Sequence, residues 1–217
     1  MNAVVAQMAV RRPLASRAIR FVLTHPIAMK MKRPLKDLWW DVRATRWENP
    51  PLPARVQSMV FVCLGNICRS PFAALLAAEQ LRAKGVHDVT VTSAGIQASQ
   101  AHRSPPEACE AATAYGLSLA DHVPRALTTE LVDASDVIVV METAQALELA
   151  ARYPQHRDRI VLLSLYDSAF SRGHGRYNIA DPFGESLAAF GECYRRLDRA
   201  VTAFTDAIAA TARAGRC

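Results

Sequence analysis

The stretch Met59-Val60-Phe61-Val62-Cys63-Leu64-Gly65-Asn66-Ile67-Cys68-Arg69-Ser70-Pro71 decides the fold of this chain. It opens with an apolar run, residues 59–62, that is typical of a short buried strand in a parallel sheet. Ser70-Pro71 predicts the start of a helix, because a hydroxyl side chain can cap the first turn and proline is tolerated there. The stretch therefore predicts a strand, a loop over residues 64–68 and a helix.

The loop between Cys63 and Arg69 has the spacing of a thiolate site that binds phosphate. Its backbone N–H groups can form an anion-binding nest, and the following helix adds the positive end of its dipole. The same field lowers the pKa of a cysteine at its centre. Arg69 offers a planar guanidinium for two phosphate oxygens, and Gly65 and Asn66 readily adopt unusual backbone angles. A structural buried cysteine is the plainer alternative, but the strand–loop–helix context favours the phosphate site.

Length and composition fit a soluble globular protein with one domain and an appendage. The chain has 217 residues, of which 51% are hydrophobic and 21% charged. Its five cysteines are scattered, without the spacing of a disulfide framework or a zinc site. A nucleophilic thiol must stay reduced, so a cytoplasmic location is expected.

The net charge of +6 is unevenly distributed along the chain. Residues 1–57 carry 11 Lys and Arg against 3 Asp and Glu, whereas residues 58–217 carry 15 against 17. The body therefore has no basic excess of the kind that marks a nucleic-acid-binding protein. We expect two parts, a basic amino-terminal extension over 1–57 and a catalytic domain over 58–217.

Three interpretations of the extension stay open. It can be disordered or partly helical, it can lie on an anionic membrane surface with Trp39, Trp40 and Trp47 at the interface, or it can be a transit peptide. No apolar run is long enough to span a bilayer, and no secretory signal is recognisable. Pro50-Pro51-Leu52-Pro53 is typical of a stiff linker before the domain.

The body alternates apolar strands with helices. Strands are expected at 59–62, 88–92, 137–141 and 160–163, and helices at 72–84, 107–115, 128–132, 144–152 and 187–212. This order predicts an α/β fold, a doubly wound four-stranded parallel sheet with helices on both faces and the phosphate-binding loop after the first strand. Ligands of such sheets lie beyond the carboxyl ends of the strands, where Cys63 and Ser93 are expected.

Residues 63–70 resemble the signature of the low-molecular-weight protein tyrosine phosphatases of bacterial type, and the resemblance covers residues 58–217. It implies Cys63 as the nucleophile, Arg69 as the phosphate clamp and Asp181, in Asp181-Pro182 after a glycine-rich loop at 171–178, as the general acid. It implies no metal and no cofactor. The residues expected to bind phosphate are Leu64, Gly65, Asn66, Ile67, Cys68, Arg69 and Ser70.

The resemblance also assigns a supporting layer. Ser70 would hydrogen-bond the thiolate, and Ser93 and His122 would hold Asn66 in its unusual conformation. Cys68 would be a resolving thiol that captures oxidised Cys63 as a disulfide. Phe183 would form one wall of the substrate slot, while residues 96–102 lack the aromatic residue expected on the other side.

The resemblance implies hydrolysis of phosphotyrosine in a protein, with a bacterial tyrosine kinase as one such partner. A protein arginine phosphatase on the same scaffold is the nearest alternative, although that subclass has threonine where this chain has Ile67. An arsenate reductase is set aside because residues 142–154 contain no cysteine. A non-catalytic phosphate-binding module is the third alternative. The extension could hold the enzyme at a membrane periphery.

Overall fold

The computed structural model describes residues 47–169 and 177–214, which belong to one compact unit. Expectations that concern residues 1–46, the glycine-rich loop at 170–176 and Cys217 lie outside the described residues.

The sheet has four strands, β1 (Ser58–Cys63), β2 (Thr90–Gly95), β3 (Val137–Val140) and β4 (Ile160–Leu162). Their order is β2-β1-β3-β4, and every pairing is parallel. The central strand β1 is entirely flanked by other strands, so its carboxyl end opens at the point where the strand order reverses. The prediction of a doubly wound parallel sheet is confirmed.

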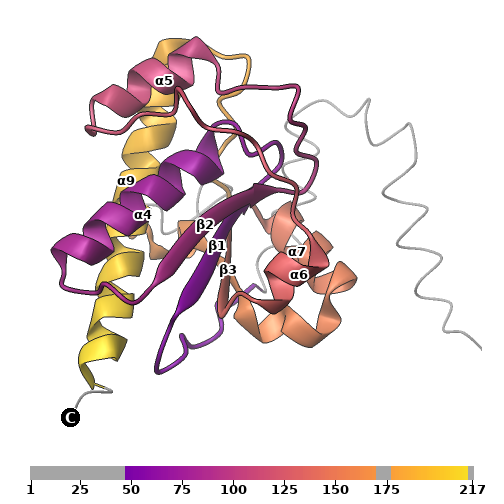
Figure 1. The fold of residues 1–217 in the computed structure, drawn as a ribbon, viewed down its shortest axis with the longest axis vertical. Coiled ribbons are helices and arrows are strands. Elements are labelled where there is room, and N and C mark those ends of the chain that lie inside the picture. Colours follow the sequence, from indigo (N-terminus) through magenta and orange to yellow (C-terminus); the bar gives the residue numbers. More distant parts are fainter. Residues whose placement is uncertain (1–46, 170–176, 215–217) are drawn as a thin grey trace, which may run out of the picture. The chain divides into compact units, whose positions relative to one another are not determined.

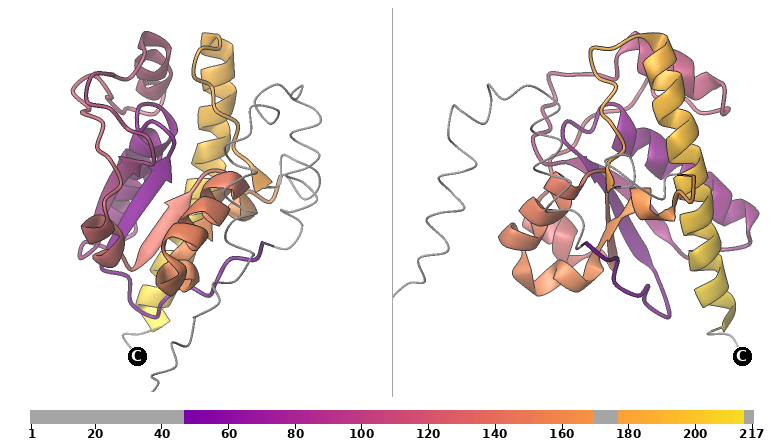
Figure 2. Two further views of the ribbon diagram at one scale, coloured as in Figure 1. Left: turned by 90° about the vertical axis from the view of Figure 1, so that its right-hand side faces the viewer. Right: turned by 180° about the vertical axis from the view of Figure 1, so that it is seen from behind.

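Helices cover both faces of the sheet (Figures 1 and 2). On one side lie α4 (Arg69–Ala83), α5 (Pro106–Thr113) and α9 (Leu187–Ala214). On the other side lie α6 (Thr129–Asp133) and α7 (Thr143–Arg152). The described residues also include the 3₁₀ helices η1 (Pro154–Arg159), before β4, and η2 (Leu163–Tyr166), after it.

The alternating side chains of β1 supply two separate cores. Met59 and Phe61 face α4 and α9, where Phe61 meets Phe204 edge-on with ring centroids 6.1 Å apart. Val60 and Val62 face the opposite way and pack with residues of α7 and β3. Because both faces of the strand are buried, its sequence is a continuous apolar run and does not alternate between apolar and polar residues.

Two local expectations are corrected by the structure. Strand β2 begins at Thr90 and continues through Gly95, beyond its expected end at residue 92, because residues 93–95 pair in register with Phe61–Cys63. Helix α4 begins at Arg69, and Cys68 is its N-cap residue. The Ser70 hydroxyl, which was expected to cap the helix, does not do so. That hydroxyl points instead toward Cys63 and Asn66.

Residues 47–57, which the sequence assigned to the extension, pack against the body. Trp47 is 6% exposed and lies in the same core as Val60. The Asn49 side chain accepts from the Leu162 N–H at 2.7 Å and donates to the Leu162 carbonyl at 3.0 Å, so it covers part of the edge strand β4. Leu52 and Val56 pack on the opposite core. This segment therefore contributes to the stability of the domain.

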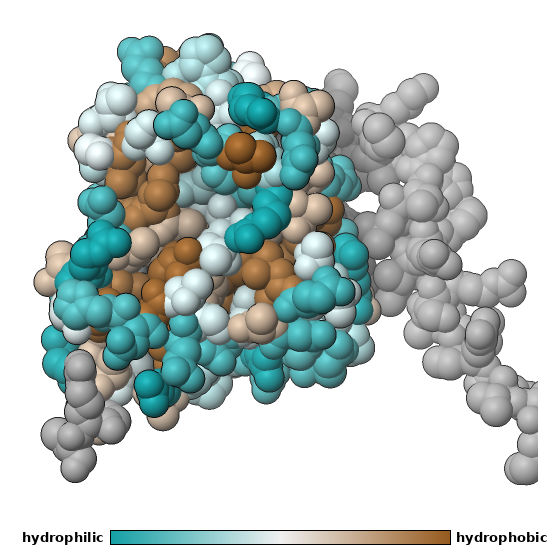
Figure 3. Space-filling model, viewed as in Figure 1, coloured by the Kyte–Doolittle hydropathy of each residue, from teal (hydrophilic) through white to brown (hydrophobic). Residues whose placement is uncertain are grey.

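The surface of the described body mixes polar and apolar side chains on the face drawn in Figure 3. None of the helices in 47–169 and 177–214 is long and apolar enough to cross a membrane.

Candidate active site

The loop after β1 wraps around the sulfur of Cys63. The Asn66 N–H lies 3.3 Å from Sγ, and the Ser70 hydroxyl lies 3.1 Å from it and can donate to a thiolate. Cys63 itself is 3% exposed. Because α4 begins at Arg69, its free N–H groups and its dipole face the same loop. An anion above the sulfur would therefore meet hydrogen-bond donors on several sides.

Asn66 fastens the loop to its surroundings. It adopts a φ of 54°, which is the left-handed region, and is buried. Its side-chain amide donates to the hydroxyls of Ser70 and Ser93, both at 2.9 Å, and accepts from the Arg125 N–H at 2.8 Å. Its carbonyl lies 2.7 Å from His122 Nε2. The strained backbone is stable because every polar atom of the side chain has a partner.

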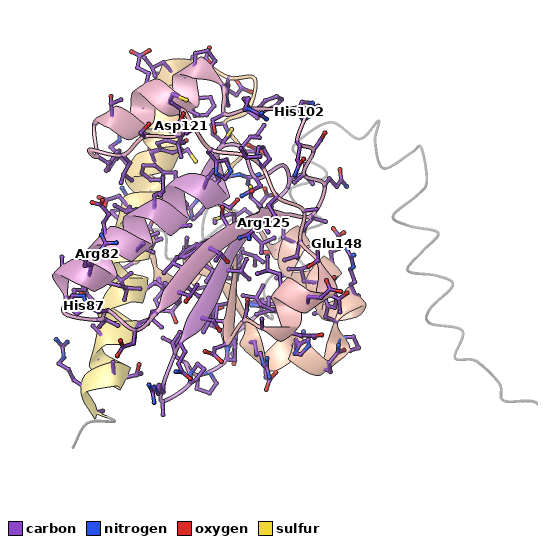
Figure 4. The ribbon with its side chains drawn as sticks, in the orientation of Figure 1. Arg82, His87, His102, Asp121, Arg125 and Glu148 are labelled. Carbon is purple, nitrogen blue, oxygen red and sulfur yellow. The ribbon has the colours of Figure 1, made fainter. Side chains whose placement is uncertain are left out.

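His122 is the donor in its contact with Asn66, since a carbonyl can only accept. Burial lowers the pKa of His122 and the nearby Arg125 lowers it further, while the hydrogen bond to Asn66 acts in the opposite direction. The ring is therefore neutral near neutral pH with its proton on Nε2. Arg125 lies beside the carboxyl end of β2 (Figure 4), where its carbonyl accepts from the Gly95 N–H at 2.9 Å.

Gly95 is a site residue that the sequence did not single out. A Cβ at this position would lie 2.8 Å from Asn66 N and from Leu64 O, and 2.9 Å from Gly65 C. The loop also rests on the residues that follow, since Ile96 N–H donates to the Cys63 carbonyl at 3.0 Å. The signal was present in the Ser93-Ala94-Gly95 stretch, but only the pairing of β1 with β2 shows that the glycine touches the loop.

Arg69 is held under the loop with 1% of its surface exposed. Its Nη1 donates to the Ile179 carbonyl at 2.9 Å and pairs with the Glu142 carboxylate, and Nη2 pairs with the Asp181 carboxylate. Burial by itself lowers the pKa of Arg69, but the carboxylates of Glu142 and Asp181 more than offset this and the pKa lies above its usual value. The Nε–H is buried and has no hydrogen-bond partner in the part of the chain that the structure describes. One donor of the guanidinium is therefore still available to a ligand.

Glu142 is the second site residue that the sequence did not assign. It follows β3 and is the N-cap of α7, where it forms a capping box with Gln145. Its position beyond the carboxyl end of β3 was the available signal, because that edge carries the ligands of doubly wound sheets. The cap fixes the carboxylate, and the carboxylate in turn fixes the Arg69 guanidinium.

Asp181 reaches the site from a separate segment. Its side chain is 37% exposed, and one carboxylate oxygen accepts from the Phe183 N–H at 3.2 Å. Before it, the Ile179 N–H donates to the Met141 carbonyl at 2.9 Å, which ties the segment to the end of β3. Phe183 is 60% exposed and Leu64 is 43% exposed, so apolar side chains from both segments are available at the surface near the site.

The remaining buried cysteines differ from Cys63 in their surroundings. Cys68 is 2% exposed, and burial raises its pKa strongly. Cys193 of α9 donates weakly to the Ala180 carbonyl, 3.5 Å from Sγ, and burial raises its pKa to about 12. Both thiols are therefore protonated at neutral pH. Within the described ranges, no cluster of three His, Cys, Asp or Glu side chains could hold a metal ion.

Comparisons with known proteins agree with this geometry. Residues 58–214 match the family described as low molecular weight phosphotyrosine protein phosphatase. A probable low-molecular-weight protein-tyrosine-phosphatase, EpsP of Ralstonia nicotianae, is 33% identical over 155 residues, which is 71% of this chain and 98% of the relative. A protein-arginine-phosphatase of Bacillus subtilis is 32% identical over 140 residues, 64% of this chain and 89% of that protein.

The solved structures show the same likeness. The crystal structure of the Erwinia amylovora tyrosine phosphatase AmsI aligns with a TM-score of 0.61 and 31% identity, covering 70% of this chain and 93% of that one. The family match spans the sheet, the loop and the Asp181 segment. This chain therefore belongs to the low-molecular-weight phosphotyrosine protein phosphatase family.

Proposed function

We propose that this protein hydrolyses phosphotyrosine in proteins through a cysteinyl-phosphate intermediate. Cys63 is the nucleophile, Arg69 and the N–H groups of residues 64–69 hold the phosphoryl oxygens, and Asp181 is the general acid and base. The domain proposed to perform this reaction comprises residues 58–217 together with residues 47–57, which pack against it, and the rest of the proposed extension is 1–46.

The arrangement of Arg69 supports this proposal most directly. A buried donor without a partner is rare, and it costs stability unless a ligand satisfies it. The Arg69 Nε–H is such a donor, and it belongs to the same guanidinium that pairs with Asp181. A phosphate oxygen is the natural partner of this N–H, because a hydrogen bond from a guanidinium to an anionic oxygen is among the strong ones.

The reaction follows from the placement of the three side chains. The Cys63 thiolate attacks phosphorus, the S–P bond forms and the P–O bond to the phenol breaks, while Asp181 gives its proton to the leaving oxygen. Ionised Asp181 then takes a proton from water as the water attacks phosphorus, and the S–P bond breaks to release phosphate. The loop donors and Arg69 stabilise the charge on the equatorial oxygens in both steps.

The preference for tyrosine rests on the apolar residues around the loop. Ile67 is buried to 9% exposure, and Leu64 and Phe183 offer exposed apolar surface to an aromatic ring. The 32% identity to a protein-arginine-phosphatase favours arginine phosphate as the second candidate. The difference from that subclass at Ile67 supports tyrosine as the main substrate.

The test is phosphate release from matched phosphotyrosine and phosphoarginine peptides, with Cys63→Ser as the blank. We expect release from phosphotyrosine that disappears in Cys63→Ser, and a shift toward phosphoarginine in Ile67→Thr. A wild-type preference for phosphoarginine would overturn the substrate and leave the mechanism intact. Release from neither peptide would leave only the role of a phosphate-binding module.

Cys68 is proposed as the thiol that rescues Cys63 from oxidation. Peroxide converts the Cys63 thiolate to a sulfenic acid, and the Cys68 thiol then displaces water to form a disulfide that a cellular thiol reduces. Peroxide-treated Cys68→Ser should regain less activity with dithiothreitol than treated wild type. Equal recovery in both proteins would exclude this role.

A phosphotyrosine-containing protein, such as a bacterial tyrosine kinase, is the proposed partner in a cytoplasmic setting. The extension, with its excess of basic residues, is proposed to contact anionic membrane surfaces. Sedimentation with anionic vesicles tests this: the full chain should sediment, and a chain that begins at residue 47 should not. Equal sedimentation of the two would exclude membrane contact through the extension.

A further inference from the structure

A buried charge cluster lies behind the Asp181 segment and is separate from the phosphate-binding loop. Asp167, which follows η2, has a side chain only 1% exposed. Arg196 Nε donates to it at 3.3 Å, and Arg199 binds both of its oxygens at 3.1 Å. Arg196 and Arg199 both come from α9, and Arg196 is buried whereas the Arg199 side chain is 42% exposed. One buried carboxylate therefore holds two arginines of different exposure.

Arg196 also contacts the backbone of the segment that leads to Asp181. Its Nη1 donates to the backbone carbonyl of Asn178. Asn178 is itself tied to α7, because its side-chain oxygen accepts from the Thr143 N–H at 2.9 Å. Arg196 thus joins α9, the end of η2 and the backbone at Asn178 through a single guanidinium.

The contact at Asn178 lies close to the catalytic residues along the chain. The next residue, Ile179, donates to the Met141 carbonyl and accepts from Arg69 Nη1. Asp181 follows and pairs with Nη2 of the same arginine. The position of the backbone over residues 178–181 is therefore fixed by hydrogen bonds from Arg196 at one end and from Arg69 at the other.

We propose that Arg196, oriented by Asp167, is a positioning residue that aims the Asp181 carboxyl at the leaving oxygen. This inference rests on the proposed function. A buried arginine is costly to hold unless its donors are satisfied, and its rigid guanidinium transmits the position of Asp167 to the Asn178 carbonyl. Arg199 also neutralises Asp167, and we expect its loss to lower stability.

The experiment compares Arg196→Met with Arg199→Met, and with Arg195→Met as a surface control. Arg195 is the neighbour on the same helix, and its side chain is 63% exposed. Arg196→Met leaves Arg199 on Asp167, so no buried carboxylate loses all of its partners. The readout is kcat/KM for phenyl phosphate, whose phenol needs a proton to leave, divided by kcat/KM for 4-nitrophenyl phosphate, whose phenolate leaves readily.

A misaimed acid slows the substrate that needs the proton more than the one that does not. We expect Arg196→Met to lower the ratio by about tenfold, because small misplacements of a catalytic group cost rate steeply. Arg199→Met should lower Tm without changing the ratio, and Arg195→Met should change neither. Arg196→Met added to Asp181→Asn should lower the ratio no further, since the acid is already absent.

An unchanged ratio in Arg196→Met, with or without a lower Tm, would overturn the proposal and leave a purely structural cluster. If Arg196→Met does not fold, Arg196→Lys replaces it, because lysine keeps the charge but loses the planar guanidinium. An unchanged ratio of the two kcat/KM values in Arg196→Lys would likewise overturn the proposal. Failure of the proposed function looks different, because wild type would then hydrolyse neither ester in a Cys63-dependent manner.

Discussion

The phosphate-binding loop and the segment that carries Asp181 meet at Arg69, but they are held in place differently. The loop occupies consecutive residues between β1 and α4, and its shape follows from a positive φ at Asn66 and the start of the helix. The Asp181 segment has no regular secondary structure at this point and depends on contacts to Met141, Arg69 and Arg196.

The difference separates binding from proton transfer. A contiguous loop at a helix start binds phosphate through backbone groups that most substitutions leave intact. A side chain delivered by a remote segment can be displaced without disturbing that binding. If Asp181 is the acid, as proposed, the enzyme can lose it and keep its affinity for phosphate. Variants of the two regions should then have different kinetic signatures.

The largest effect is expected from Asp181→Asn, which removes the proton but keeps the size of the side chain. The kcat/KM for phenyl phosphate should fall by about 10² to 10⁴, the usual contribution of a positioned acid. The fall for 4-nitrophenyl phosphate should be much smaller. Inhibition by inorganic phosphate should persist, because asparagine still offers an oxygen to Arg69 Nη2 and because Cys63 and the loop are unchanged. An equal fall for both esters would show that Asp181 acts on binding.

The next effect is expected in the loop, from Gly95→Ala. The added methyl group would lie 2.8 Å from Asn66 N and Leu64 O, which are backbone atoms that cannot rotate away. We expect destabilisation by about 1–3 kcal/mol from overpacking and weaker inhibition by phosphate, measured by thermal unfolding and by inhibition assays.

Gly191→Ala is the matched control for Gly95→Ala, because a Cβ there meets nothing within 4 Å and the position is inside α9. It should leave activity unchanged and raise stability by about 0.5–1 kcal/mol. If Gly95→Ala binds phosphate as wild type does, the loop does not depend on its contact with β2.

A smaller effect is expected from Glu142→Gln at the junction of the two regions. Glutamine keeps an oxygen for the cap of α7 but loses the charge that pairs with Arg69. Phosphate affinity should fall by about tenfold, because the hydrogen bond from Arg69 loses the negative charge of its acceptor and holds the guanidinium less firmly. The ratio between the two aryl phosphates should stay near that of wild type. A changed ratio would mean that Glu142 acts mainly on Asp181.

The phosphate-binding loop could be predicted from the sequence because its residues are consecutive. Cys63, Arg69 and Ser70 fall within one short stretch whose spacing, between a strand and a helix, favours a phosphate site over a structural cysteine. The packing of residues 47–57 could not be predicted from neighbouring residues, because Asn49 hydrogen-bonds to Leu162, which is distant in the sequence. Glu142 and Arg196 are ordinary charged residues in the sequence, and only the fold shows that each is bonded near the active site.

The smallest effect concerns pH and the link between His122 and the loop. Burial lowers the pKa of this half-buried ring below its unfolded value of 6.5, so the folded protein favours the neutral form. The stability that follows is fully present above that value and is lost as the pH falls below it. His122→Gln keeps an N–H donor that can reach the Asn66 carbonyl but cannot titrate. Wild type should therefore lose slightly more stability than His122→Gln between about pH 7.5 and 5.5, measured by denaturant unfolding. Parallel stability curves would show that the loop does not sense the protonation of His122.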